Sequence, residues 1–278
     1  MERKTLIVIG IFGGLFLLVS FVFSGLLVFY LMFGYLEHNA HIIFIEDYLN
    51  EPFQYQLQPM QGIYYEQSLV EIYPIGQVSA DLQNMCQMIM ATYAIPCRIR
   101  PPIIDTFDSQ IDSDVLFTRG FAKQSGSHQA HFIVYVTEKN IYSQTVRPRN
   151  SYSFVNYHYE YTPQRIDGVF VVSPYLFNQA IPRYPIANHQ EIIVERALIT
   201  QTLTSLGRAI FQNVRERDPQ CISATVNSLS DVLQKTGRLC QQESEHLTQW
   251  QSQLGEPRNI SSHQMQELER IKRLYYFE

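Results

Sequence analysis

The hydrophobic pattern of the chain begins with a long run that nothing charged interrupts. Residues 5–36 contain no Asp, Glu, Lys or Arg. At about 1.5 Å per residue, a helix of this length exceeds the roughly 30 Å hydrocarbon core of a bilayer, so it can span with tilt. A cleaved signal peptide, the competing interpretation, has an apolar region of only about 7–15 residues. The pattern therefore predicts a single transmembrane helix at residues 1–36.

Charges on either side of this run predict its orientation. Arg3 and Lys4 precede it, whereas Glu37, Glu46 and Asp47 follow it. By the positive-inside rule, the N-terminus lies on the cytosol-like or matrix-like side and the rest of the chain lies opposite. Bacterial and mitochondrial inner membranes both suit this arrangement, and we favour the mitochondrial one.

Small residues recur within the predicted membrane helix. Gly10 and Gly14 form one small-xxx-small pair, and Ser20 and Ser24 form another. Such pairs let another transmembrane helix approach closely, although glycine is also simply common in these helices. Residues 37–67 then lack a period, and we expect an ordered connector lying on the membrane or on partner proteins.

After residue 67 the pattern changes to short apolar strands that alternate with amphipathic helices. Strands are predicted at residues 69–73, 97–100, 132–136, 153–159 and 168–173. Ser79 is predicted to cap a first helix that extends to residue 93. This alternation predicts an α/β domain over residues 68–243 with a mixed, twisted sheet.

One long helix dominates the second half of the chain. Its apolar positions recur at spacings of three, four or seven, and they are Ile192, Ile199, Leu203, Leu206, Ile210 and Val214. This spacing predicts an apolar stripe that packs on the sheet. The other side carries Thr200, Thr204, Arg208, Gln212 and Arg215. Residues 244–278 are predicted to form a C-terminal helical extension.

Composition narrows the function classes. The content of 46% hydrophobic residues suffices for a packed core, and a net charge of −5 gives no reason to expect nucleic acid. Four cysteines in a chain of this size do not predict a disulfide framework. Cys221 and Cys240 could bridge or could be buried thiols, and the sequence leaves both possibilities open.

Several short motifs occur in the order found in one peptidase family. They are Ile75-Gly76-Gln77-Val78 before the first helix, residues 137–142 and 168–173 at strands, Leu206-Gly207 in the long helix, and residues 218–223, 227–231 and 234–240 in the tail. Together these segments resemble the archaemetzincins, zinc metallopeptidases with a helical HExxHxxGxxHC motif. The resemblance covers roughly residues 68–243, and it implies a metzincin-like fold.

The resemblance also implies where zinc ligands would lie, and this sequence departs there. If Leu206-Gly207 anchors the comparison, the first ligand falls on Thr204, the general base on Ser205, the second ligand on Arg208 and the third on Val214. Zinc needs imidazole, thiolate or carboxylate ligands, which these residues do not supply. The resemblance thus implies a degenerate member without zinc, and only Cys221 and Cys240 remain of the second metal site.

Two further hypotheses concern what replaces the zinc. His128 and His131, with His158 or His189, could hold a relocated metal, which would make the chain an active membrane-anchored zinc metallopeptidase. Alternatively, the guanidinium of Arg208 could stand in for the cation and pair with a carboxylate, Asp167 or Glu191. A solvent-facing Arg208 is the competing interpretation.

From these patterns we expect a membrane-anchored pseudo-metallopeptidase without catalytic residues or cofactor. Loss of the ligands and the general base removes the activated water that the metal-dependent mechanism requires. The expected partners are the lipid bilayer and other subunits of a membrane complex, with a respiratory-chain complex as the candidate, and no small-molecule substrate is expected. A peptide-binding receptor that uses the former cleft is a further hypothesis.

Overall fold

The chain divides into two compact units, Met1–Glu51 and Pro52–Glu278. The computed structural model describes Ser24 and, in the second unit, residues 63–65, 69–126, 130–145, 155–161, 166–180, 190–212, 218, 220–224, 226, 231–232, 235, 237–259, 261–263 and 266. Within these residues, no helix is both long and apolar enough to cross a bilayer. The predicted membrane helix, with Gly10, Gly14 and Ser20, lies outside the described residues, and Ser24 is helical and exposed.

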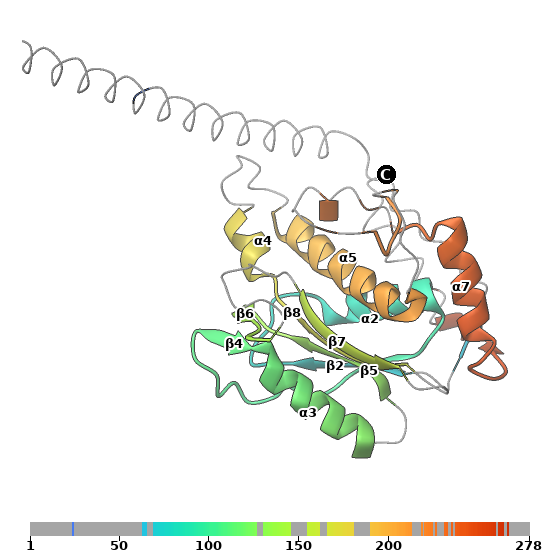
Figure 1. Cartoon of the computed structure of the whole chain (residues 1–278), viewed down its shortest axis with the longest axis horizontal. Coiled ribbons are helices and arrows are strands. Elements are labelled where there is room, and N and C mark those ends of the chain that lie inside the picture. The colour runs from blue at the N-terminus through green and yellow to red at the C-terminus, as the bar shows by residue number, and fades with distance from the viewer. Residues whose placement is uncertain are drawn as a thin grey trace, which may run out of the picture. The chain divides into compact units, whose positions relative to one another are not determined.

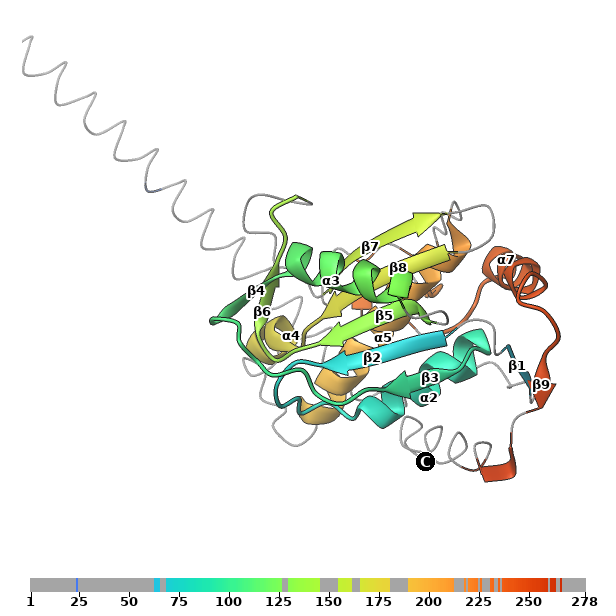
Figure 2. The ribbon, with the colours of Figure 1, turned by 90° about the horizontal axis from the view of Figure 1, so that it is seen from below.

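A five-stranded mixed sheet forms the centre of the second unit (Figure 2). The strands are β2 (Leu69–Pro74), β3 (Cys97–Ile99), β5 (Ala130–Val136), β7 (Val155–Tyr161) and β8 (Ile166–Val172), in the order β3-β2-β5-β8-β7. Four of them are parallel, and β7 pairs antiparallel with β8 at one edge. The predicted mixed α/β architecture is confirmed, and each of the five predicted strands is present.

Helices cover both faces of this sheet, as Figure 1 shows. The helices α2 (Leu82–Tyr93) and α5 (Gln190–Phe211) lie on one face, and α3 (Ser113–Gly126) lies on the other. Alternate strand residues point to opposite faces. Ile133 and Tyr135 of β5 therefore join the core cluster beneath α3, whereas Phe132 packs on the α5 side against Trp250 at 6.2 Å between ring centroids.

The first helix begins later than predicted. Its N-cap is Asp81, whose carboxylate accepts from the backbone N–H groups of Gln83 and Asn84. Ser79 instead donates from its backbone N–H and its hydroxyl to the Glu138 carboxylate after β5. Aspartate and serine are both favoured N-caps, so Asp81, which directly precedes the helix, takes the role that was predicted for Ser79.

Some elements were not predicted because their hydrophobic pattern is weak. They are β1 (Ile63–Tyr64), β4 (Gln110–Asp112), β6 (Asn140–Tyr142), α4 (Tyr175–Ala180) and β9 (Arg258–Asn259), together with α3. The strand β1 lies in the segment expected to be a connector, and it pairs with β9 near the other end of the domain. Apart from α3, these elements are too short to show a local period, and tertiary contacts specify them.

All four cysteines are paired. Cys86 of α2 bridges Cys97 of β3 with 5.3 Å between the Cα atoms, and Cys221 bridges Cys240 with 5.5 Å. The expectation that four cysteines make no disulfide framework is therefore wrong. The count of cysteines did not reveal that Cys86 of α2 lies beside Cys97 of the strand that follows it.

Candidate functional site

The long helix α5 is buried on every side along its second half. Leu203 and Leu206 are buried, as the apolar stripe predicts, but Thr204 and Ser205 are buried as well, at 0% and 1% exposure. The polar side of the helix therefore does not face an open cleft at these positions. A helix surrounded in this way belongs to the interior of the domain.

Close packing against α2 fixes the position of α5. The Tyr93 hydroxyl donates to the carbonyl oxygen of Leu203 at 2.5 Å. A Cβ added at Gly207 would lie 2.8 Å from that hydroxyl oxygen and 3.1 Å from a ring carbon of Phe211. Glycine at this position is thus explained by the approach of a tyrosine.

The side chains at the expected degenerate ligand positions differ in their hydrogen bonding. The Thr204 hydroxyl is buried and has no hydrogen-bond partner in the described part of the chain. The Ser205 hydroxyl donates to the carbonyl oxygen of Gln201 at 2.9 Å within the helix. Val214 lies outside the described residues. Neither hydroxyl is placed to act as a general base.

Arg208 is half-buried and points to the segment around Cys221. Its guanidinium donates to the carbonyl oxygens of Ser223 at 3.3 Å and Ala224 at 3.4 Å, and to the Tyr157 hydroxyl of β7 at 3.4 Å. The sequence hypothesis offered Asp167 or Glu191 as its partner. The acceptors in these hydrogen bonds are instead a phenol and two main-chain carbonyls.

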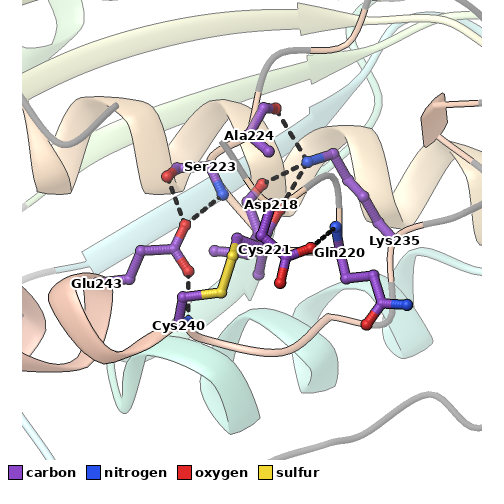
Figure 3. The surroundings of a disulfide bond; sticks show 9 residues. Asp218, Gln220, Cys221, Ser223, Ala224, Lys235, Cys240 and Glu243 are labelled. Atoms are coloured by element: carbon purple, nitrogen blue, oxygen red, sulfur yellow. Dashed lines mark hydrogen bonds between the residues drawn. A yellow bond between two sulfur atoms is a disulfide. The ribbon is translucent and has the colours of Figure 1, made fainter. Parts of the chain in front are cut away.

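A second cation meets the same segment. Lys235 is fully buried, and its ammonium donates to the carbonyl oxygens of Cys221, Ile222 and Ala224 at 2.7, 3.2 and 2.9 Å. With the contacts of Arg208, every carbonyl from residue 221 to residue 224 accepts from a cation. We call residues 221–224 the carbonyl segment. Figure 3 shows Lys235 reaching it beside the disulfide.

The disulfide and a buried carboxylate hold this segment to the next helix, α7 (Gln241–Gln251). Cys240 precedes α7, and its bridge to Cys221 ties the helix start to the segment. Glu243 is fully buried. It accepts from the Ser223 hydroxyl, from the Ser223 backbone N–H at 2.6 Å and from the Cys240 backbone N–H at 2.7 Å (Figure 3). The last of these bonds is half of a capping box.

Burial sets the protonation of the lysine. Removal from water, and after it the nearby positive charge of Arg208, lowers the pKa of Lys235 from 10.5 to about 8. Glu243, Asp231 and Asp218 oppose this shift by stabilising the charged form. The site therefore holds two cations close together, balanced by surrounding carboxylates.

Ligand-type side chains gather at one place within the described residues. Asp218, Cys221 and Cys240 have their ligand atoms within 4.8 Å of one another. Both sulfur atoms are in the disulfide, so neither is a thiolate that could bind zinc. His131 on β5 and His158 on β7 do not belong to this group, and His128 and His189 lie outside the described residues.

Comparisons with known proteins give structures but no sequence relatives. No family model and no curated protein matches the sequence. The archaemetzincin of Methanopyrus kandleri is 15% identical with a TM-score of 0.47, covering 70% of this chain and 98% of its own. A zinc-dependent peptidase from Methanocorpusculum labreanum (16%, 0.47) and the archaemetzincin of Archaeoglobus fulgidus (14%, 0.45) each cover 64% of this chain and 99% of their own. TM-scores below 0.5 carry no argument about this chain.

The donor set of α5 does not fit the zinc that such peptidases hold. A zinc site needs unprotonated nitrogen, sulfur or carboxylate donors that converge on one point. At the described positions where the resemblance places ligands, the helix offers the Thr204 hydroxyl and the permanently charged guanidinium of Arg208, which is bound to carbonyls. The side chains of Thr204 and Arg208 therefore cannot coordinate zinc.

Sequence reasoning named some of these residues and missed others. Thr204, Ser205 and Arg208 lie on one stretch of α5, and Arg208 meets the segment that starts at Cys221. Of the two possibilities left open for Cys221 and Cys240, the structure has the disulfide. Glu243 was missed, although its position three residues after Cys240 is a capping-box spacing. Lys235 lies within the tail motif at residues 234–240, but nothing local marked it as buried.

Proposed function

We propose that this chain is a non-catalytic, membrane-anchored pseudo-metallopeptidase that serves as an accessory subunit of a larger membrane complex. One observation carries the non-catalytic part. The side chains of α5 at the expected ligand positions are structural, because Thr204 and Ser205 are buried and Arg208 is bound to the carbonyl segment. Groups used in this way are not available to a substrate or a metal.

The accessory role follows from what the chain retains. The apolar run at residues 5–36 supports a membrane anchor, and the paired cysteines support an oxidising compartment for the domain. A membrane-anchored domain that has no catalytic residues can still function by binding other proteins. Burial of the polar side of α5 weighs against the receptor hypothesis, since that hypothesis needs an open cleft beside the helix.

Two measurements on the full chain test the proposal. Elemental analysis of the purified protein should find no stoichiometric zinc, and peptidase assays should find no activity above that of a buffer control. Native mass spectrometry of the gently solubilised membrane should find the chain together with other subunits. Stoichiometric zinc, with peptidase activity that His131→Ala or His128→Ala abolishes and His246→Ala retains, would establish the active-enzyme alternative.

A further inference from the structure

One short motif near the end of the domain has no part in the candidate functional site. Asn259-Ile260-Ser261 has the form Asn-x-Ser, in which the middle residue is not proline. This form is the acceptor motif for N-linked glycosylation, which attaches an oligosaccharide to the asparagine side chain. None of the other asparagines in the sequence is followed by Ser or Thr at the second position.

The structure places this motif on the surface of the domain. Asn259 is the last residue of β9, and it is paired in register with Ile63 of β1 (Figure 2). Asn259 and Ser261 are both exposed. The pairing with β1 therefore holds the backbone in place while the modified position remains open to solvent.

Other asparagines of the domain lack one or both of these features. Asn84 and Asn156 are only 5% and 7% exposed, and their side-chain amides donate to neighbouring side chains at 3.0 and 2.6 Å. A bulky, hydrated glycan does not fit at such positions. Asn178 is exposed, but Gln179 and Ala180 follow it, so it lacks the motif. Asn259 combines the motif with exposure.

The disulfides and the predicted orientation are consistent with a compartment in which this modification occurs. The two disulfides indicate oxidising surroundings, and the lumen of the endoplasmic reticulum provides them. Arg3 and Lys4 predict that the domain lies across the membrane from the N-terminus, which in this organelle is the lumen. A mitochondrial membrane, which we favoured from the N-terminal segment, offers no glycosylating enzyme. The motif therefore favours the endoplasmic reticulum.

We propose that Asn259 carries an N-linked glycan, which is added in the lumen of the endoplasmic reticulum. The donor is an oligosaccharide joined through a diphosphate to a polyisoprenoid lipid. The Nδ2 atom of Asn259 forms a bond to the anomeric carbon of the sugar, and the bond from that carbon to the diphosphate oxygen breaks. The lipid diphosphate leaves, and Nδ2 loses one proton to solvent. The transfer involves no oxidation or reduction.

This inference rests on the membrane anchor and orientation within the proposed function, and not on the accessory role. It also restricts where a partner subunit can bind. A glycan at Asn259 is bulky and hydrated, so it keeps other proteins away from the surface around β1 and β9. Contacts with partner subunits are therefore expected on other surfaces of the domain.

The test uses the full chain from the membranes of the cells that make it. The wild type should migrate at a higher apparent mass that peptide N-glycosidase lowers, and peptide mapping should then find the Asn259 amide converted to a carboxylate. Asn259→Gln and Ser261→Ala should lack the shift, whereas Ser261→Thr should retain it because threonine also completes the motif. Asn178→Gln removes an exposed asparagine outside the motif, and it should leave the shift unchanged.

A second acceptor motif separates the site from the compartment. His246→Asn creates one with Thr248 at an exposed position of α7, and it should add a second glycan. A glycan on His246→Asn but none on the wild type would overturn the modification of Asn259 and leave the orientation standing. No glycan on either protein would overturn the inference together with its compartment. A glycosylated chain that native mass spectrometry finds without other subunits would support the inference, while the accessory function would fail.

Discussion

At the scale of single residues, Lys235 explains more of the candidate site than any predicted ligand does. A fully buried ammonium is costly unless its donors are satisfied, and here three carbonyl oxygens accept from it. The free energy of this arrangement depends on pH, because burial lowers the pKa of Lys235 from 10.5 to about 8. Its titration is therefore a direct readout of the site.

Lys235→Met should change how stability varies with pH. In the wild type, the unfolded chain keeps a proton on Lys235 between about pH 8 and pH 10.5 that the folded chain has released. The free energy of unfolding therefore rises with pH across that window, and Lys235 contributes up to about 3 kcal/mol to this rise. Urea unfolding from pH 7 to pH 10 should show the rise in the wild type, and the variant should lack it. Parallel pH profiles for the two proteins would refute the assignment.

At the scale of elements, the sequence predicted the helices and strands whose apolar residues are dense or regularly spaced, and it missed most of the others. The strands β2, β5 and β8 and the helix α5 were predictable because their apolar residues are dense or regularly spaced. The helix α3 was missed because Gly120 and Gln124 share its buried side with Leu116 and Phe117, which weakens the apolar pattern. Burial of Thr204 was also unpredictable, since it depends on elements that are distant in sequence.

The contact between α2 and α5 gives a prediction at this scale. Gly207→Ala adds a methyl group that would lie 2.8 Å from the Tyr93 hydroxyl oxygen. Alanine favours helices by roughly 0.5–1 kcal/mol over glycine, but overpacking a core costs about 1–3 kcal/mol. The variant should therefore be less stable than the wild type in urea unfolding.

A second substitution checks that this loss comes from the tyrosine. Tyr93→Phe removes the hydroxyl, together with its hydrogen bond to the carbonyl oxygen of Leu203. In a double-mutant cycle, Gly207→Ala should cost less in the Tyr93→Phe background than in the wild type. Additive effects would show that the added methyl group meets another atom, and Phe211 is the next nearest residue.

At the scale of the whole molecule, the disulfides relate to the compartment that the orientation predicts for the domain. The two bridges join neighbouring elements, α2 to β3 and the carbonyl segment to the start of α7, over sequence separations of 11 and 19 residues. Each closes a loop short enough to contribute about 3 kcal/mol by the chain-entropy estimate. Such bonds persist in oxidising compartments. This agrees with the predicted orientation, in which the basic N-terminus remains on the reducing side.

The disulfides and the predicted orientation together predict a specific pattern of thiol labelling for the full chain in its native membrane. In denaturant without reductant, a maleimide should modify none of the four cysteines, and after reduction it should modify all of them, as intact mass reports. In the variant Glu2→Cys, the added cysteine should be a free thiol on the opposite side, since residue 2 precedes the apolar run. An impermeant maleimide added from the domain's side should not reach it until the membrane is permeabilised. Labelling of Glu2→Cys without permeabilisation would refute the orientation, whereas free native thiols before reduction would refute the oxidising compartment and leave the span untouched.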